Sequence, residues 1–328
     1  MSNVPISIAG NEEVVSVFKA PTDPVDKNRC WVIHIRNCQN GVSYVIKIYP
    51  ETDKDFCIHE TNIAHLLRSS HIPITTPLPI SIPRKTQTNV VVSNFKFIPG
   101  IPLSSRADDI LSKCKIICGI IKSFAETKIT ISHDKSCQYS KNQGFNFWTA
   151  PLGYVATLSY RDHLHEFEKD IARATLIGEE QVQFYSIWKL LMNKYGDIAD
   201  SVKALAHCDL NSDNIIITCE DIAVIDVGLA VHTSLFLEWG GIVAHLGIEV
   251  WDEINSSISQ YIRHKHHVEM TSKTIEHLTA LFAVKRAVRR VAYLSHLSKQ
   301  PGADKTYIRQ HLERQMSVIR NMFLVLKG

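Results

Sequence analysis

A short polar segment between two apolar runs contains the residues in this chain that are best suited to chemistry. Asp209 lies five residues before Asn214, and Asp226 follows Asn214 by twelve residues. Residues 215–225 have the composition of two short β-strands joined by a turn. Such a hairpin carries Asn214 at its entrance and Asp226 at its exit, so both oxygen ligands can face one Mg²⁺ ion held against phosphates. Asp209 is placed to accept a proton from an attacking hydroxyl. The alternative is a polar turn whose side chains only cap backbone groups, which explains each residue singly but not all three together.

A lysine in the N-terminal third interrupts an otherwise apolar strand pattern. Residues 42–49 alternate as a β-strand that contains Lys47, and a buried charge is costly unless it is paired. Glu60 follows thirteen residues later, in a segment (59–67) whose apolar residues recur at helical spacing. We therefore expect Lys47 and Glu60 to pair. The simpler alternative is an exposed lysine and an exposed glutamate that do not meet.

Together, these residues resemble the catalytic core of the protein-kinase-like phosphotransferases. In that core a loop aspartate is the base, an asparagine five residues later binds metal, and so does the aspartate of a later Asp-x-Gly motif. Departures from the protein-kinase pattern make the chain more similar to the aminoglycoside phosphotransferase and choline kinase group. The matching segments are 207–214, Gly10-Asn11, His71-Ile72-Pro73-Ile74 and Phe97-Ile98-Pro99-Gly100-Ile101-Pro102-Leu103. The resemblance extends from about residue 7 to about residue 230.

Three departures from the pattern keep a non-catalytic alternative open. Residues 9–17, where a glycine-rich loop over the phosphates is expected, contain one glycine rather than three. Asn211 stands where protein kinases tend to have lysine and this group histidine. After Asp226 the chain continues Val-Gly-Leu-Ala-Val-His, without the acidic residues and the Gly-Asp-Pro turn usual in the group.

The resemblance implies an α+β, two-lobed protein-kinase-like fold, with a small antiparallel-sheet N-terminal lobe and a larger, mostly helical C-terminal lobe. Residues 1–95 would form the nucleotide-binding lobe, residues 96–102 the hinge, and residues 103–328 the catalytic and acceptor-binding lobe. The aromatic, irregular segment 143–149 is either a packing loop or part of the acceptor site. Apolar periodicity predicts helices in the second lobe at residues 107–127, 180–195, 233–249, 269–298 and 303–326.

The resemblance also implies a role for each residue of the core set. Lys47, oriented by Glu60, would neutralise the α- and β-phosphates of the nucleotide. Asp209 would be the catalytic base, and Asn214 and Asp226 would bind Mg²⁺.

Further residues would complete the nucleotide site. Gly10 and Asn11 would lie near the phosphates, and Phe95 and Phe97 near the nucleotide base. His207 would brace the catalytic loop through backbone hydrogen bonds without taking part in chemistry. The implied cofactors are ATP and Mg²⁺, although the pattern does not distinguish ATP from GTP.

Basic residues near the C-terminus bear on the identity of the acceptor. Residues 263–328 contain thirteen Lys or Arg and four Asp or Glu. Lys285, Arg286, Arg289 and Arg290 recur at helical spacing, so they should form one charged stripe that faces solvent or the cleft. This stripe is either a solvated face or a surface for an anionic acceptor or RNA.

Composition and cysteine content indicate a globular protein in a reducing compartment. The chain has 328 residues, of which 45% are apolar. It contains no uninterrupted apolar run approaching about 18 residues, so we expect no membrane span. Its first residues do not have the pattern of a secretory signal. Eight cysteines show no paired spacing, so we expect free thiols and a cytoplasmic location.

The predicted function is transfer of the γ-phosphate of ATP, with Mg²⁺, to a hydroxyl of a small molecule. One alternative is a kinase for a macromolecular hydroxyl, on RNA or a peptide, which the basic stripe suggests. The other is a non-catalytic nucleotide-binding scaffold, which the glycine-poor loop suggests. The complete set of Lys47, Glu60, Asp209, Asn214 and Asp226 argues against the scaffold.

Overall fold

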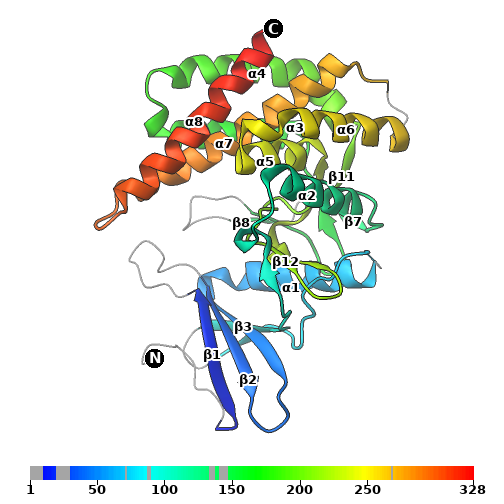
Figure 1. Ribbon diagram of the computed structural model, residues 1–328, viewed down its shortest axis with the longest axis vertical. Helices are drawn as coiled ribbons and strands as arrows, with labels where there is room; N and C mark the ends of the chain where they lie inside the picture. Colours follow the sequence, from blue (N-terminus) through cyan, green and yellow to red (C-terminus); the bar gives the residue numbers. More distant parts are fainter. Residues whose placement is uncertain are drawn as a thin grey trace.

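The computed structural model has an antiparallel sheet near the N-terminus followed by a mostly helical remainder, which confirms the expected α+β architecture. Figure 1 shows the sheet at one end of the molecule and the helices at the other, with helix α1 (Lys54–Ser69) between them. The structure describes residues 10–19, 30–70, 72–86, 90–132, 137–139, 147–266 and 269–328.

The N-terminal sheet presents one face to a small apolar cluster and the other to α1. Its strands follow the order β1-β2-β3-β5-β4, each antiparallel to its neighbour. Ile33, Ile35 and Ile48 are buried together on the first face. Lys47 points to the second face, because successive side chains of a strand alternate. The strands are β1 (Glu12–Lys19), β2 (Trp31–Asn37), β3 (Ser43–Pro50), β4 (Arg84–Lys85) and β5 (Val90–Lys96).

Helix α1 carries Glu60 to the second face of the sheet. Its apolar residues Ile63, Ala64 and Leu67 are buried in the main hydrophobic core. The helical spacing seen in the sequence is therefore the spacing of a buried face, as predicted. Glu60 lies on the same helix and is itself buried.

The remaining helices enclose one large core. Helix α7 is buried along most of its length, including the side chain of Lys285. Figure 1 shows α7 and α8 running side by side at the end of the molecule farthest from the sheet. The helices are α2 (Ile110–Ala125), α3 (Tyr160–Arg173), α4 (Glu180–Asp200), α5 (Phe236–Leu246), α6 (Trp251–Lys265), α7 (Ser272–Leu297) and α8 (Lys305–Lys327).

All five predicted helices are present; four have ends within three residues of those expected, and α4 extends five residues beyond its expected end. The prediction for residues 233–249 was too long, because β14 (Val231–Ser234) precedes α5 and a 3-10 turn, Ile248–Val250, follows it. Helices α3 and α6 were missed. The start of α3 does carry a local signal, since Ser159 and Asp162 form a reciprocal capping box.

Short strands position the polar segment that the sequence singled out. β12 (Ile215–Ile217) and β13 (Ile222–Val224) form the predicted antiparallel hairpin. β6 (Ile101–Pro102), at the end of the expected hinge segment, adds a third strand to this hairpin. Gly100 permits the approach, because a Cβ there would lie 2.5 Å from the Ile217 carbonyl oxygen. The other short strands are β7 (Ile131–Ser132), β8 (Cys137–Tyr139), β9 (Phe147–Thr149), β10 (Val155–Ala156) and β11 (Lys203–Ala206).

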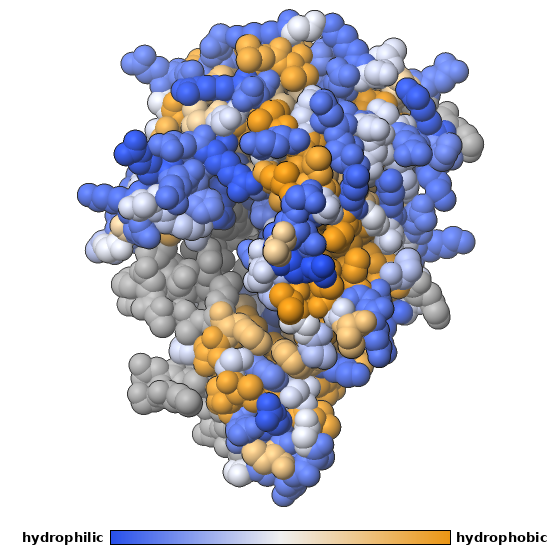
Figure 2. Space-filling view, in the orientation of Figure 1, coloured by the Kyte–Doolittle hydropathy of each residue, from blue (hydrophilic) through white to orange (hydrophobic). Residues whose placement is uncertain are grey.

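The surface is mostly polar over the helical part. In Figure 2 hydrophilic side chains cover most of that part, and a band of hydrophobic side chains runs down the middle of the face in view. No helix in the described part of the chain is long and apolar enough to cross a membrane.

Candidate active site

Three charged residues from distant parts of the chain meet between the sheet and the helical part. Lys47 donates to Asp226 Oδ1 at 2.7 Å and forms an ion pair with Glu60. The Tyr49 hydroxyl donates to the other oxygen of Glu60. The expected pairing of Lys47 with Glu60 is therefore present, and the exposed-lysine alternative is excluded because the Lys47 side chain is only 12% exposed.

The two carboxylates determine the charge state of Lys47. Burial alone lowers the pKa of its ammonium group, but the carboxylates of Asp226 and Glu60 outweigh burial and raise it. Lys47 is therefore a permanent cation at neutral pH. It lies where it can neutralise a bound anion such as a phosphate group.

The turn after β13 directs Asp226 into this site. Asp226 adopts the left-handed conformation, with φ 62°, and its side chain is 49% exposed. Two residues later, Gly228 lies so close to α1 that a Cβ would be 2.7 Å from Phe56 Cζ and 3.1 Å from Glu60 Cβ. The glycine thus lets the Asp-x-Gly turn pack directly against the helix that carries Glu60.

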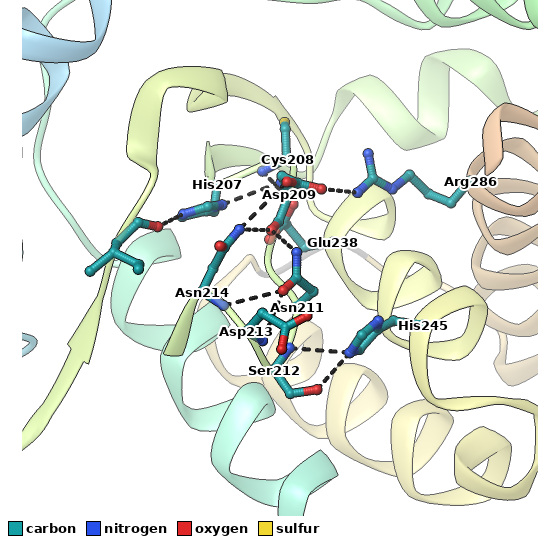
Figure 3. A network of polar contacts seen from close by, with 11 residues as sticks. His207, Cys208, Asp209, Asn211, Ser212, Asp213, Asn214, Glu238, His245 and Arg286 are labelled. Atoms are coloured by element: carbon teal, nitrogen blue, oxygen red, sulfur yellow. Dashed lines mark hydrogen bonds and ion pairs between the residues drawn. The ribbon is translucent and has the colours of Figure 1, made fainter. Parts of the chain in front are cut away.

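The loop before β12 is held by its own side chains. Asn214 Nδ2 donates to the Asp209 carbonyl oxygen at 2.9 Å, and Asn211 Nδ2 donates to the same oxygen at 3.1 Å. Figure 3 shows both amides directed at the Asp209 backbone. The Asp209 side chain remains 44% exposed, so its carboxylate is accessible to another molecule.

His207 braces this loop, as expected from the sequence. Its Nε2 lies 3.0 Å from the Ile225 carbonyl oxygen, and its Nδ1 accepts from the Asp209 backbone N–H at 3.3 Å. The second contact requires Nδ1 to be unprotonated, so Nε2 carries the proton and donates. The neutral ring therefore joins the Asp209–Asn214 loop to the strand end before Asp226.

A buried glutamate that the sequence analysis missed supports the loop from below. Cys208 has φ 64°, a left-handed backbone conformation that residues other than glycine rarely adopt. The Cys208 backbone N–H donates to Glu238 Oε1 at 2.7 Å (Figure 3). Burial raises the pKa of Glu238, and the charge of Arg286 and the hydrogen bond from the Cys208 N–H offset this only in part. The sequence did contain a signal for this role, because Glu238 is an acidic residue within the otherwise apolar helix α5.

A second support comes from the other end of α5. His245 Nε2 accepts from the Ser212 backbone N–H at 3.1 Å and lies 2.7 Å from the Ser212 hydroxyl. Burial lowers the pKa of His245 to about 4, so the ring is neutral at physiological pH. Helix α5 therefore contacts the loop at two points and fixes its distance from the core.

The candidate metal ligands have suitable donor atoms. Because Asn214 Nδ2 is bound to a carbonyl, its Oδ1 is the atom left to face a cation. Asp226 supplies a half-exposed carboxylate. One amide and one carboxylate oxygen suit Mg²⁺ that is bound mainly through substrate phosphates. No cluster of three or more His, Cys, Asp or Glu residues forms a metal site among the described residues, so phosphate oxygens are needed to complete such a coordination shell.

Aromatic rings gather on the sheet next to the hinge. Phe97 stacks on His34 with ring centroids 3.9 Å apart, and Phe18 stacks on both at 6.0 to 6.4 Å. Phe97 therefore lies on the sheet face that carries Lys47. Phe95 is buried in the core, with Lys47 Nζ 5.6 Å from its ring centroid. His34 was not singled out, although a histidine within an apolar strand was a visible signal.

The expected position of Gly10 and Asn11 has to be corrected. They directly precede β1, and the Asn11 carbonyl oxygen accepts from the Cys38 N–H at 2.8 Å, in the turn between β2 and β3. Lys47 lies opposite the first residues of β2, about 16 Å along the strand from this turn. β1 ends and β2 begins at the Lys47 end of the sheet. Residues 20–29 are outside the described part of the chain. Gly10 and Asn11 were misplaced because a lone glycine does not reveal which end of a strand it occupies.

Solved structures of several phosphotransferases share this arrangement of elements. A microcompartment-associated aminopropanol kinase matches with a TM-score of 0.60 at 14% identity, over 98% of this chain and 94% of its own. A spectinomycin phosphotransferase in complex with ADP and spectinomycin matches with a TM-score of 0.58 at 14% identity, over 94% of this chain and 92% of its own. The ethanolamine kinase of Plasmodium vivax matches with a TM-score of 0.57 at 15% identity, over 94% and 83%. This chain has the aminoglycoside phosphotransferase-like fold. No family model matches the sequence, and no curated protein sequence matches it.

Within this fold, a pocket opens beside the catalytic loop. Its walls come from α3, α5, α7, the loop before β12 and the segment after Asp226. Arg286 connects the pocket to the loop, since its guanidinium lies 3.5 Å from Asp209 Oδ1 (Figure 3). The pocket is lined by Trp148, Leu158, Glu166, Cys208, Leu229, Val231, Leu237, Lys285, Arg286 and Arg289.

The expected basic stripe is not one exposed surface. Lys285 is buried, with 1% exposure, and donates to Glu166 at 2.6 Å, which corrects the expectation that it faces solvent or an open cleft. Arg286 points toward Asp209, and Arg290 donates to the Tyr307 hydroxyl at 2.8 Å. The apolar residues on the neighbouring face of α7 are buried, namely Leu281, Val284, Val288, Val291 and Leu294. The four basic residues thus serve different partners, and the structure gives no support to an RNA-binding stripe.

Part of the aromatic segment 143–149 reaches this pocket. Residues 143–146 lie outside the described part of the chain. Trp148 lines the pocket and donates from Nε1 to Glu166 Oε1 at 3.1 Å.

Proposed function

We propose that this protein is an ATP- and Mg²⁺-dependent phosphotransferase that moves the γ-phosphate to a hydroxyl of a small molecule. The observation that carries the proposal is the Lys47–Asp226 contact, which joins the sheet to the turn that follows the Asp209–Asn214 loop. The fold shared with small-molecule kinases supports it. We propose residues 1–95 as the nucleotide-binding lobe, 96–102 as the hinge and 103–328 as the catalytic and acceptor-binding lobe.

The reaction needs positioning and neutralisation of charge more than reactive side chains. The acceptor oxygen forms a bond to the γ-phosphorus while the bond from that phosphorus to the β,γ-bridging oxygen breaks, and ADP leaves. Asp209 orients the acceptor hydroxyl and takes its proton. Lys47, fixed by Glu60, neutralises the α- and β-phosphates.

Bound Mg²⁺ would supply positive charge to the phosphate oxygens. Asn214 Oδ1 and the Asp226 carboxylate are the protein atoms that would hold it. The Lys47–Asp226 contact favours the Asp226 carboxylate in its charged form, which is the form that binds a cation.

The nucleotide base is proposed to stack near the hinge. Phe97, His34 and Phe18 provide flat rings on the correct face of the sheet. The hinge backbone after β5 would then bind the base edge, with ATP as the nucleotide. Seven cysteines whose side chains the structure describes are free thiols, which supports a reducing compartment, the cytoplasm, as the place of action.

The test compares wild-type protein with Asp209→Asn in an ADP-release assay over a panel of small hydroxyl compounds. We expect the variant to lose nearly all transfer while it binds ATP as well as wild type, because the carboxylate acts on the acceptor. Asp213→Asn is the matched control, since Asp213 is exposed in the same loop. Near-normal transfer by Asp209→Asn would show that another group is the base. Lack of Mg-ATP binding to wild-type protein would refute the proposed function altogether.

A further inference from the structure

The Asp209–Asn214 loop has no cation of its own to hold the Asp209 carboxylate. Residues 207–214 contain neither lysine nor arginine. The Asn211 amide is occupied by the backbone of the loop, since Nδ2 donates to the Asp209 carbonyl oxygen at 3.1 Å and Oδ1 accepts from the Asp213 N–H at 2.9 Å. A charged partner for the carboxylate therefore has to come from another element.

Helix α7 supplies that partner. Arg286 Nη2 lies 3.5 Å from Asp209 Oδ1, and Figure 3 shows the arginine extending to the carboxylate from the side opposite His207. The Arg286 side chain is 21% exposed, and the Asp209 side chain is 44% exposed. Because the pair is partly buried, solvent and salt screen it less than an ion pair on the open surface.

The close contact between α5 and α7 determines where Arg286 lies. Gly240 in α5 packs against the backbone of α7, because a Cβ there would lie 2.5 Å from a backbone nitrogen of that helix. A Cβ on Gly241 would lie 3.6 Å from Arg286 Nε, so the arginine side chain crosses this glycine at van der Waals distance. Helix α5 also supports the Asp209–Asn214 loop at two points. Both partners of the ion pair are thus fixed relative to α5.

A second acid helps to keep Arg286 in this position. Burial raises the pKa of Glu238, and the charge of Arg286 lowers it in part, so the two groups interact. Glu238 is buried and accepts from the Cys208 N–H at 2.7 Å. Of the two acids beside Arg286, Asp209 is therefore the one that another molecule can reach.

The two oxygens of the Asp209 carboxylate have different surroundings. Oδ1 faces the guanidinium of Arg286, and Oδ2 lies 3.5 Å from Asn214 Nδ2. Asn214 is the proposed metal ligand, so Oδ2 lies on the side where the γ-phosphate would bind. An arginine at Oδ1 limits rotation of the carboxylate and leaves Oδ2 to meet the acceptor.

We propose that Arg286 is a positioning residue, which holds Asp209 Oδ1 so that Oδ2 takes the proton of the acceptor hydroxyl. The inference rests on the proposed function, since it assigns a role in the same reaction. The acceptor oxygen bonds to the γ-phosphorus, its proton passes to Oδ2, and the bond to the β,γ-bridging oxygen breaks as ADP leaves. Arginine suits this role because its guanidinium keeps its charge and presents its donors in fixed directions.

The test follows ADP release at saturating Mg-ATP, with water as the acceptor and with the panel of small hydroxyl compounds. With water, the products are ADP and inorganic phosphate. Wild type is compared with Arg286→Gln, Arg286→Lys and Arg286→Ala. The alanine variant is also assayed with guanidinium chloride, at concentrations far below those that unfold proteins, and with sodium chloride at the same ionic strength.

Two further measurements separate positioning from other roles. Arg290→Gln is the matched control, because Arg290 lies on the same helix but donates to the Tyr307 hydroxyl. Calorimetry with Mg-AMP-PNP and with Mg-ADP reports whether Arg286 contacts the γ-phosphate, which only the first nucleotide mimics. Should Arg286→Ala fail to fold, the glutamine and lysine variants carry the same comparison.

We expect Arg286→Gln to lower kcat by about 10- to 100-fold and to leave the KM for ATP unchanged, as for a misplaced catalytic group. Arg286→Lys should keep part of the activity, because it keeps the charge without the planar donors. Guanidinium should restore part of the kcat of Arg286→Ala, which a loss of packing alone would not allow. Arg290→Gln should behave as wild type, and the affinities for AMP-PNP and ADP should not change.

Several results would overturn the inference. They are a wild-type kcat in Arg286→Gln, equal losses in Arg286→Gln and Arg290→Gln, or failure of both lysine and guanidinium to restore activity. Weaker AMP-PNP binding with unchanged ADP binding would place Arg286 on the γ-phosphate instead. In each of these cases wild type still releases ADP, so only this inference is wrong. If wild type binds no Mg-ATP, or releases no ADP with any acceptor, the proposed function fails and this inference fails with it.

Discussion

Replacement of Lys285 by methionine should lower the free energy of unfolding by about 3–5 kcal/mol, because the Glu166 carboxylate then stays buried without its partner. The Nζ–Oε2 distance of 2.6 Å corresponds to a gross attraction of about 6 kcal/mol at an effective dielectric constant of about 20. Lys285 is 1% and Glu166 5% exposed, so solvent screens this attraction little. Methionine has nearly the length of the lysine stem, so the loss of packing is small.

The assay is urea-induced unfolding of wild type, Lys285→Met, Glu166→Gln and the double variant. Each single variant should lose stability, because each leaves one partner of the pair buried alone. The double variant should be more stable than the sum of the two losses predicts, because it contains neither charge. Lys299→Met is the control, since Lys299 is exposed in the turn after α7, and it should lie within about 0.5 kcal/mol of wild type.

The pH dependence provides an independent check. When folding lowers the pKa of a carboxyl group, its charged form stabilises the folded state at pH values above its pKa in the unfolded chain. This contribution is lost as the pH falls toward its pKa in the folded state. Since the pKa of Glu166 lies well below 4.5, wild type should lose stability as the pH falls below about 4.5. In Lys285→Met, protonation of Glu166 instead removes a buried unpaired charge. The difference in the free energy of unfolding between this variant and wild type should therefore shrink as the pH falls. Equal stability of Lys285→Met and Lys299→Met at pH 7 would refute the buried ion pair between Lys285 and Glu166.

Three further substitutions test the nucleotide side of the site. Asp226→Ala should weaken Mg-ATP binding more than Mg-free ATP binding, because its carboxylate acts through the ion; calorimetry that finds equal losses would remove the metal assignment. Gly228→Ala should destabilise the protein by about 1–3 kcal/mol and raise the KM for ATP. The new Cβ would lie 2.7 Å from Phe56 and displace the helix that carries Glu60. Unchanged urea-induced unfolding would contradict this prediction. Phe97→Ala should weaken ATP binding by about tenfold through lost stacking on the base, without affecting acceptor affinity; a change in acceptor KM alone would move Phe97 out of the nucleotide site.

The sequence alone predicted the residues of the candidate site, because Asp209, Asn214 and Asp226 lie within one short segment around a tight hairpin. Asn214 and Asp226 flank one tight hairpin, so twelve residues of sequence translate directly into neighbouring strand ends. Lys47 could also be recognised locally, since a charge within an apolar strand requires a partner. These constraints are short-range or follow from the cost of burying a charge, so they hold whatever the rest of the chain does.

The tertiary structure alone decided how distant elements meet. Lys285 pairs with a residue 119 positions away, and adjacent residues on a helix point about 100° apart, so Lys285 can be buried while Arg286 reaches Asp209. Helical spacing shows which basic residues lie near one another on α7. It does not show how α7 is rotated against α3, and that rotation decides which partner each basic residue meets. Glu238 beneath Cys208, and Gly10 at the far end of β1, depend in the same way on packing and strand direction. Such contacts follow from how whole elements fill the core, which no local segment of the sequence encodes.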